Sequence, residues 1–426
     1  MYPCTPLQEG LMSLTMKRPE DYVMQVVLEL REDIDEGRLR AAWEQAVQSV
    51  AILRTRIVHT EQAGLLQAVL AQKIDWIEAE ELEQYCALDK ATWMRLGEPL
   101  ARYALVKKPG TAKRWFVWTA HHAIYDGWSL PLILQTVRTI YRGDRPPSHL
   151  DFKTLVKYLH ELDPQATAAY WKTSLSDCQA IPFPAVPSGT EQLRTTETMR
   201  HESPPVHRVC SDITIPTIIR AAWALIASRQ TNSNDVSFGV TVTGRNAPVA
   251  GIEIVIGPTI ATVPLRVMVE GTQTVSAYLA KQQQQAIEMM PYEHVGLQNI
   301  ARLGDDAQQA CHFQTLLVVQ TESNDAAQDE ELGRWQGRAE SANFSTYPLV
   351  LQCQMSKEGL LLEASFDPQV MERWIVERIL GQFSYVVHQL AGADEKTRVA
   401  DIAATTPLET AEIWKENGQV PEAQET

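Results

Sequence analysis

The chain has 426 residues, of which 45% are hydrophobic and 21% are charged, and its formal net charge at pH 7 is −15. This is the composition of a globular protein that is long enough for two domains. The acidic balance argues against a nucleic-acid partner, because binding phosphates requires a positively charged surface.

The first half of the chain is predicted to mix helices and strands. An amphipathic helix is expected over about 35–50, where apolar residues recur at helical spacing. A second helix should follow the Asp126-Gly127 dipeptide, with Ser129 as its N-cap and Gly143 at its end. Strands are expected where apolar residues alternate or run together, over 22–32, 53–60, 103–108 and 114–122.

The second half shows the same mixture, beyond a segment that is predicted to be a linker. Residues 179–208 contain five prolines and no periodic apolar pattern. The expected fold is therefore α/β with two lobes, one over 1–178 and one over 209–405. The second lobe is expected to hold helices over 215–230, 275–290 and 371–392, and strands over 235–244, 261–270, 314–321 and 360–367.

The cysteines bear on redox state and metal binding. They stand at 4, 86, 178, 210, 311 and 353 with no CxxC pair, so neither a zinc cluster nor a disulfide framework is expected. The N-terminus lacks the basic and long apolar regions of a signal peptide, and no apolar run reaches the roughly 18 residues of a membrane-spanning helix. We therefore expect a cytoplasmic protein with reduced thiols and no membrane partner.

Two adjacent histidines, His121 and His122, end an apolar strand, and Asp126 follows four residues later. Successive side chains of a strand point to opposite faces, so one ring can face a cavity while the other braces the core. A core histidine, a metal ligand and a general base are the three interpretations. A metal would need three or four converging ligands, and no HxxxH or HExxH spacing occurs, so none is expected.

General-base chemistry needs no cofactor, only correct placement. Near pH 7 a neutral imidazole can accept a proton from an attacking amine or hydroxyl. The backbone N–H of Gly127 is a candidate donor to the oxyanion that would develop. Asp126, at the end of a buried strand, would either fold back beneath the imidazole or pair with a buried cation.

Several motifs occur in an order that is typical of one enzyme family. The stretch HHAIYDG over 121–127 matches HHxxxDG, and the sequence resembles the condensation domains of nonribosomal peptide synthetases, in the form common among fungal synthetases. It departs from their usual motifs at Ser49-Val50, where Arg-His is common, and at Ala261, where Asn is common. The companion motifs are YPCTPLQEGLM (2–12), ILRTRI (52–57), SHLDFKTLVKYL (148–159), FGVTVTGR (238–245), IGPTIATVPLR (256–266), PYEHVGLQNI (291–300) and FQTLLVVQ (313–320).

The resemblance implies two chloramphenicol-acetyltransferase-like lobes that form a V-shaped pseudo-dimer with a central tunnel. Upstream donor and downstream acceptor carrier proteins would insert phosphopantetheine arms from its two ends, and the domain itself would bind no cofactor. Residues 406–426 resemble the start of a linker toward an adjacent adenylation domain. An excised domain of this kind is expected to be monomeric.

The same resemblance implies roles for the residues nearest the chemistry. His122 would remove a proton from the attacking amine or position that amine. Gly127 would permit a tight turn and close approach of the acyl thioester, and His121 would support the site. Thr262 and Arg266 would belong to a strand crossover between the lobes.

Further residues are expected to hold the site together. Asp126 would be structural, paired with Arg54 from the ILRTRI motif. Trp128 and Ser129 are expected beside the tunnel, where Trp128 would be either wall or plain core. Each of these roles follows from a motif match at that position.

Two functions compete with amide-bond formation during chain elongation. Fungal terminal condensation domains release a peptide by macrocyclisation and carry Ser-His-xxx-Asp with a later tyrosine. This chain has Tyr141 at that place, but His121 replaces the serine, and the simplest interpretation of Tyr141 is helix packing. A non-catalytic recruitment domain would have lost the histidines. An elongating, amide-forming acyltransferase is therefore the expected function.

Overall fold

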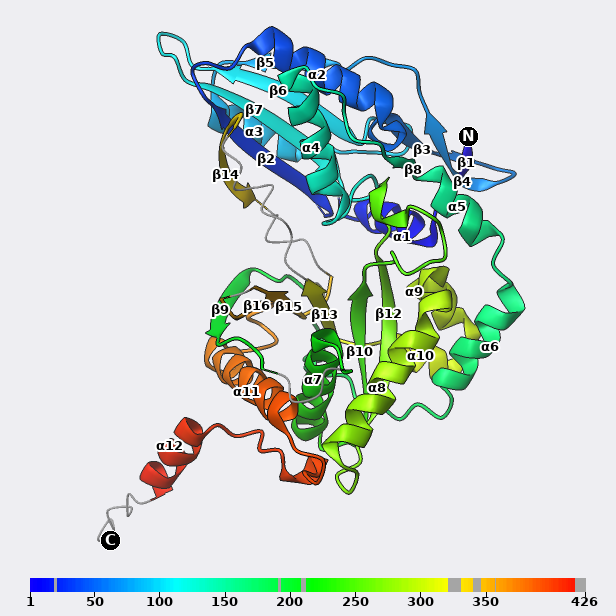
Figure 1. The fold of residues 1–426 in the computed structure, drawn as a ribbon, viewed down its shortest axis with the longest axis vertical. Coiled ribbons are helices and arrows are strands. Elements are labelled where there is room, and N and C mark those ends of the chain that lie inside the picture. Colours follow the sequence, from blue (N-terminus) through cyan, green and yellow to red (C-terminus); the bar gives the residue numbers. More distant parts are fainter. Residues whose placement is uncertain are drawn as a thin grey trace.

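The structure is a computed structural model that describes residues 1–18, 21–190, 193–207, 212–320, 331–339, 346–356 and 358–417. These residues form two α/β lobes, each with its own sheet and hydrophobic core (Figure 1). Cys210 and residues 418–426, the end of the segment expected to lead toward an adenylation domain, lie outside the described residues. Of the helices described, none has the length and apolarity that crossing a bilayer requires.

The first lobe is built on a five-stranded sheet whose central strands are antiparallel. In order across the sheet the strands are β14 (Gly333–Ala339), β2 (Val23–Leu30), β7 (Arg114–His121), β6 (Ala101–Lys107) and β5 (Trp76–Ala79). Its helices are α2 (Glu36–Ser49), α3 (Leu82–Ala91) and α4 (Ser129–Arg142).

Strand β7 is buried on both faces, which explains its continuous apolar sequence. Phe116 and Trp118 pack on Trp43 of α2, with ring centroids 5.0 and 5.2 Å apart. Trp115 and Val117 face the other way, into the cluster that includes residues of α3. Because neither face meets water, the strand has no polar alternation, and it carries its last residue, His121, into the middle of the molecule.

Helix α1 (Pro6–Thr15) anchors the N-terminal segment beneath the end of β7. A capping box between Thr5 and Gln8 starts the helix. The Gln8 side chain is fully buried and donates to Gln67 Oε1 at 3.0 Å and to the carbonyl of Ala123 at 2.9 Å. Gln67 belongs to a small sheet with the order β1 (Tyr2–Pro3), β4 (Gly64–Val69), β3 (Thr55–Thr60). The N-terminal motif therefore holds the turn that follows the two histidines.

The second lobe is built on a six-stranded mixed sheet with helices packed on one face. Leu317 points into the helical core, whereas Leu316 and Val318 point to the opposite face. The strand order is β12 (Ala261–Met268), β10 (Asp235–Val242), β13 (Thr315–Gln320), β15 (Leu349–Met355), β16 (Leu360–Phe366) and β9 (Glu197–Ser203). The long helices are α7 (Ile215–Thr231), α8 (Val275–Met289) and α11 (Arg373–Gly392).

Two segments from the second half of the chain complete the first lobe. Strand β14 pairs antiparallel with β2, and β11 (Val255–Ile256) pairs with β8 (Leu150–Asp151). Val255 and Ile256 are buried in the first hydrophobic core. The remaining helices are α5 (Lys153–His160), α6 (Pro164–Ser174), α9 (Leu297–Ile300), α10 (Asp305–Cys311) and α12 (Pro407–Asn417).

Two local predictions are wrong. Within the predicted linker 179–208, residues Glu197–Ser203 form β9, which pairs along its whole length with β16. Ser129 is not an N-cap: α4 begins at Ser129, and its first N–H donates to the Asp126 carboxylate at 2.7 Å. The side chain three residues before the helix thus provides the capping that a helix start requires.

The lobes touch where α1 meets the segment leading into α9. The side-chain amide of Gln298 donates to the carbonyl of Pro6 at 2.9 Å. Gly296 has φ +86°, and a Cβ atom built there would lie 2.4 Å from Pro6 Cβ. Only glycine allows both this backbone conformation and this close approach.

We expect Gly296→Ala to lower the free energy of unfolding by about 2 kcal/mol or more, because alanine disfavours positive φ and would push the lobes apart. Gly10→Ala is the matched control, since a Cβ there has only Gln298 Oε1 within 4 Å, at 3.9 Å, and α1 would gain helix propensity. Urea unfolding measures both. If Gly296→Ala and Gly10→Ala have equal stability, the close approach of Gly296 to Pro6 does not require glycine.

Candidate active site

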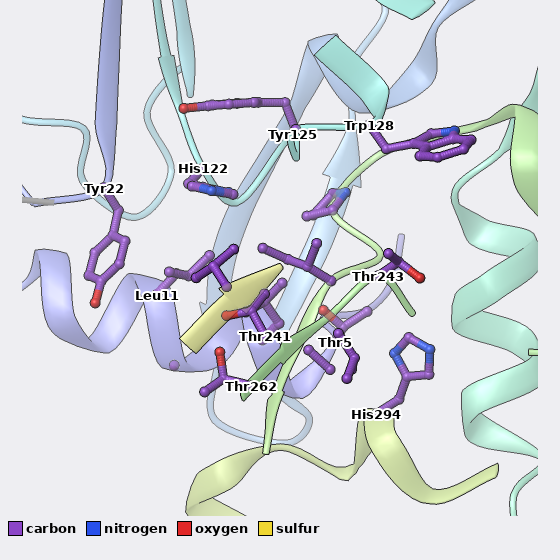
Figure 2. Close-up of a pocket in the computed structure, with 18 of the residues that line it drawn as sticks. Thr5, Leu11, Tyr22, His122, Tyr125, Trp128, Thr241, Thr243, Thr262 and His294 are labelled. Atoms are coloured by element: carbon purple, nitrogen blue, oxygen red, sulfur yellow. The ribbon is translucent and has the colours of Figure 1, made fainter. Parts of the chain in front are cut away.

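A cavity of about 1450 Å³ lies between the two lobes. The first lobe contributes His122, Gly127 and Trp128 to its lining, and the second contributes Thr262 and His294 (Figure 2). The wall from the second lobe includes the face of the six-stranded sheet that its helices leave uncovered. Tertiary structure therefore brings the predicted histidine motif to a cavity that neither lobe forms alone.

His121 is a brace in the core. It is 0% exposed, and its Nδ1 accepts a hydrogen bond from the backbone N–H of Ala123 at 3.0 Å. Nε2 therefore carries the proton and donates to Thr15 Oγ1, 2.8 Å away. Burial first, and then the neighbouring His122, lower the pKa of His121 to about 3, so the ring is neutral at pH 7.

His122 points the other way, into the cavity (Figure 2). Its ring stacks on the ring of Tyr125, with centroids 4.8 Å apart and planes at 15°. Its backbone N–H donates to the carbonyl of Tyr22 at 2.8 Å. The two rings face opposite ways, as alternation at a strand end predicts, and the stacked tyrosine fixes the orientation of the cavity-facing one.

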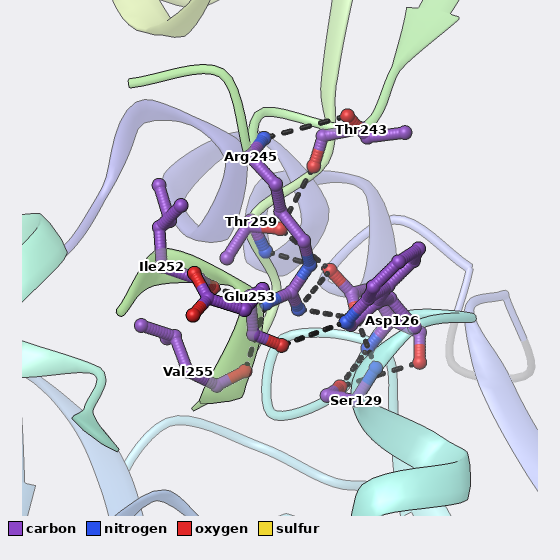
Figure 3. A network of polar contacts seen from close by, with 9 residues as sticks. Asp126, Ser129, Thr243, Arg245, Ile252, Glu253, Val255 and Thr259 are labelled. Atoms are coloured by element: carbon purple, nitrogen blue, oxygen red, sulfur yellow. Dashed lines mark hydrogen bonds and ion pairs between the residues drawn. The ribbon is translucent and has the colours of Figure 1, made fainter. Parts of the chain in front are cut away.

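The Asp126 carboxylate is fully buried and is held from several segments (Figure 3). Besides the Ser129 N–H, it accepts from the Thr259 N–H at 2.8 Å and the Thr259 hydroxyl at 3.0 Å. Arg245 Nη2 lies 3.3 and 3.4 Å from its two oxygens. Arg245 also donates Nη1 to two carbonyls, those of Ile252 at 2.8 Å and Val255 at 3.0 Å.

The predicted pairing of Asp126 with Arg54 is wrong. Arg54 ends the short helix η1 (Ala51–Arg54) and donates to the carbonyls of Leu70 at 2.9 Å and Gln48 at 3.4 Å. The buried cation that Asp126 requires is Arg245, from the second half of the chain. Burial lowers the pKa of Arg245, and the negative charge of Asp126 partly offsets that lowering. The only sequence signal for this residue was its place at the end of the quoted motif FGVTVTGR.

The structure separates Trp128 from Ser129, although both were expected beside the tunnel. Trp128 is 47% exposed and lines the cavity, with its indole N–H donating to the Glu253 carbonyl at 2.9 Å and its ring centroid 5.5 Å from the Arg245 guanidinium. Ser129 does not line the cavity: it is 0% exposed, and its hydroxyl accepts from the Asp126 N–H at 2.8 Å. Its hydrogen bond to the Asp126 backbone places it inside the turn.

Gly127 lines the cavity, but its backbone gives no reason for glycine, because its φ is not positive. A Cβ atom there would have no neighbour within 4 Å. The main chain at Gly127 is therefore open to the cavity.

Three other residues singled out from the sequence have clear surroundings. Thr262 lies on β12, where a strand was predicted, but it lines the cavity, a position that the sequence did not predict. Arg266 lies outside that lining and pairs with Asp235 on β10 at 2.8 Å, within its own sheet.

The hydroxyl of Tyr141 accepts a hydrogen bond from the Asp35 N–H at 3.0 Å, so Tyr141 joins α4 to the start of α2. In the described part of the chain, no three His, Cys, Asp or Glu side chains converge as a metal site.

Comparisons with known proteins agree with one another. The family model described as "Condensation domain" matches residues 1–414. The nonribosomal peptide synthetase TES of Alternaria alternata is 50% identical over 423 residues, which are 99% of this chain and 8% of that protein. Peramine synthetase A of Epichloe festucae is 42% identical over 421 residues, 99% of this chain and 15% of that protein. The chain thus spans a small part of these relatives.

Solved structures share the fold. The first condensation domain of the calcium-dependent antibiotic synthetase, in complex with a substrate analogue, has a TM-score of 0.68 at 17% identity, over 94% of this chain and 98% of that one. A mutant of the starter condensation domain of rhizomide synthetase has a TM-score of 0.74 at 18% identity, over 94% of this chain and 98% of that one. The fold class expected from the sequence is confirmed.

The pairing of Asp126 can be tested with double-mutant cycles. Asp126→Asn should lower the free energy of unfolding by about 3 kcal/mol, because it leaves the Arg245 charge buried without its counter-ion. Coupling to Arg245→Met should be about 1–3 kcal/mol, and coupling to Arg54→Met close to zero. Urea unfolding of the single and double variants measures both couplings. If the coupling to Arg54→Met exceeds the coupling to Arg245→Met, the ion pair of Asp126 is with Arg54, as the sequence predicted.

The buried neutral His121 makes stability depend on pH. Above pH 6.5 the ring is neutral in both states and contributes no slope. As pH falls from about 6.5 toward 3, the unfolded chain binds a proton that the folded chain does not, so the free energy of unfolding falls by about 1.4 kcal/mol per pH unit. His121→Gln should lower the slope of the free energy of unfolding against pH by the contribution of one bound proton, measured by chemical denaturation between pH 4 and pH 7. An unchanged slope would contradict the assignment.

Proposed function

Since the chain belongs to the condensation-domain family, we propose that it forms an amide bond between a donor aminoacyl or peptidyl thioester and the amine of an acceptor aminoacyl thioester. Both substrates would be carried on phosphopantetheinylated carrier proteins. The observation that carries this proposal is the position of His122, on the wall of a cavity that both lobes line. A reaction between two carried substrates requires such a shared space.

The chemistry is acyl transfer without a resident cofactor. The acceptor amine attacks the thioester carbonyl, a C–N bond forms, and the C–S bond breaks as the thiolate leaves. The amine proton passes to His122 and then to the thiolate, or His122 holds the amine in line for attack. We propose that the Gly127 N–H donates to the oxyanion, since Gly127 lines the cavity and a Cβ atom there would have no neighbour within 4 Å.

The surroundings of His122 support a positioned imidazole. The Asp126 network fixes the turn on one side of the reacting groups, and the Tyr125 ring restricts the imidazole itself. His121 would contribute through its bond to the Ala123 N–H, which shapes the same turn. We therefore propose His122 as the catalytic residue, with His121 and Asp126 as supporting residues.

Elongation is favoured over macrocyclising release or simple recruitment. The side chain of Tyr141, whose spacing suggested a terminal domain, bonds to Asp35 and does not line the cavity. The HHxxxDG histidine that would be lost in a recruitment domain faces the cavity. We further propose that the functional division of the chain lies between residues 178 and 209, and that 406–426 leads toward an adenylation domain.

His122→Ala should reduce kcat for amide formation by about 10²–10⁴, the range for losing a positioned general base, while leaving the melting temperature unchanged. The assay is intact-mass analysis of donor- and acceptor-loaded carrier proteins. Tyr141→Phe is the control and should keep the wild-type rate. Full product yield from His122→Ala would remove the basis of the assignment, and a cyclised product from the wild type would favour release.

A further inference from the structure

A second histidine, His294, borders the same cavity. It lies on the short helix η3 (Met290–Val295) that follows α8, and only 9% of its surface is exposed. In Figure 2 its ring lies on the side of the drawn residues away from His122, close to Thr243 and Thr5. The mechanism proposed above does not use this residue.

The tautomer of His294 follows from one hydrogen bond. Nε2 lies 3.0 Å from the carbonyl oxygen of Gly244. A carbonyl only accepts, so Nε2 carries the proton and Nδ1 keeps its lone pair. Burial lowers the pKa of His294 to about 4, so the ring is neutral at pH 7. Among the described residues, no group donates a hydrogen bond to Nδ1, although the ring borders the cavity.

The ring is held rigidly against the main chain. Gly244 has φ +65°, and a Cβ atom there would lie 2.5 Å from His294 Cε1 and 1.7 Å from the Thr259 carbonyl oxygen. Glycine is therefore required at 244 for the imidazole to approach. Thr259 is itself bonded to Asp126, so the ring rests on a segment that is already fixed. An acceptor fixed in this way loses little entropy when it binds a ligand.

We propose that Nδ1 of His294 accepts a hydrogen bond from an amide N–H of the carried substrate, either in its pantetheine arm or in its acyl chain, and that His294 is a positioning residue for condensation. The proposal rests on the proposed function. A neutral acceptor on the cavity wall matches a neutral amide N–H, because an unpaired N–H would otherwise lose its hydrogen bond to water on entry.

Two isosteric variants separate the two nitrogens. His294→Gln places an amide N–H near the Nε2 position and keeps the bond to Gly244, but removes the acceptor at Nδ1. His294→Asn places an oxygen near Nδ1 and loses the bond to Gly244. We expect His294→Gln to raise KM for the donor-loaded carrier protein about tenfold, with kcat changed less than twofold. His294→Asn should keep KM within about threefold of wild type and lower the melting temperature.

The comparison has defined outcomes. If His294→Gln leaves KM unchanged, or if both variants raise KM equally, the proposal is overturned and His294 serves only to hold Gly244. Repeating the assay with an N-acetylcysteamine thioester as donor narrows the source of the amide, because this group keeps the pantetheine amide nearest the thioester and lacks the farther one. The defect disappears if the farther amide is the partner and persists if the nearer amide or an amide of the acyl chain is.

A binding measurement makes the test independent of turnover. In protein labelled with ¹⁵N-histidine, the Nδ1 resonance of His294, assigned by its loss in His294→Gln, should move upfield on addition of S-acetyl-pantetheine or of an N-acetylaminoacyl N-acetylcysteamine thioester. No shift with either probe overturns the proposal. If wild-type protein forms no amide, the proposed function fails; if it forms amide but His294→Gln has wild-type KM, only the role of His294 fails.

Discussion

The buried carboxylate of Asp126 is the constraint on which the site depends. A charge that is 0% exposed is costly unless it is paired and fully hydrogen-bonded. Its donors are the start of α4, the Thr259 backbone and hydroxyl, and Arg245. Satisfying this charge therefore brings residues from the first lobe and a crossing segment of the second half together at one point. The turn that connects His122 to Gly127 takes its shape from that requirement.

The adjacent histidines show how environment separates two identical side chains. His121 has both nitrogens bonded within the core, and burial lowers its pKa to about 3. His122, one residue later, stacks on Tyr125 and borders the cavity. Strand alternation alone assigns them to opposite faces, but which face is core depends on α1, whose Thr15 hydroxyl accepts a hydrogen bond from His121 Nε2. His121 is thus bonded to the turn that follows His122, while His122 borders the cavity.

Local patterns predicted many of the regular elements, but not β4, β5, β15, α3 or α6. Helical periodicity predicted α2, and the apolar run predicted β7, because both signals are contained in a short window of sequence. Strand β9 was missed because it is an edge strand with the sequence ETMRHES. Its side chains alternate between exposed and half-buried, and its backbone pairs only with β16. Such a strand needs few apolar residues, and the prolines near it indicated a linker instead.

The site was predicted in part, for a comparable reason. The placement of His122 at a cavity follows from its strand and its motif, but the partner of Asp126 depends on tertiary contacts between residues 119 positions apart. Arg54 is half-buried and the Arg245 side chain is buried, and nothing in either local sequence identifies which of the two pairs with Asp126. His294 lies in a quoted motif but gave no chemical signal, because its role depends on its contact with Gly244.

The crossing of β14 into the first lobe has a consequence for how the chain acquires its structure. Its partner β2 lies about 300 residues earlier, so the first sheet keeps an unprotected edge throughout synthesis of the intervening chain. Contacts of such large sequence separation slow folding, and an open apolar edge invites pairing with other molecules. Dissecting the protein at the apparent boundary between its lobes would therefore yield fragments prone to aggregation rather than two autonomous folding units.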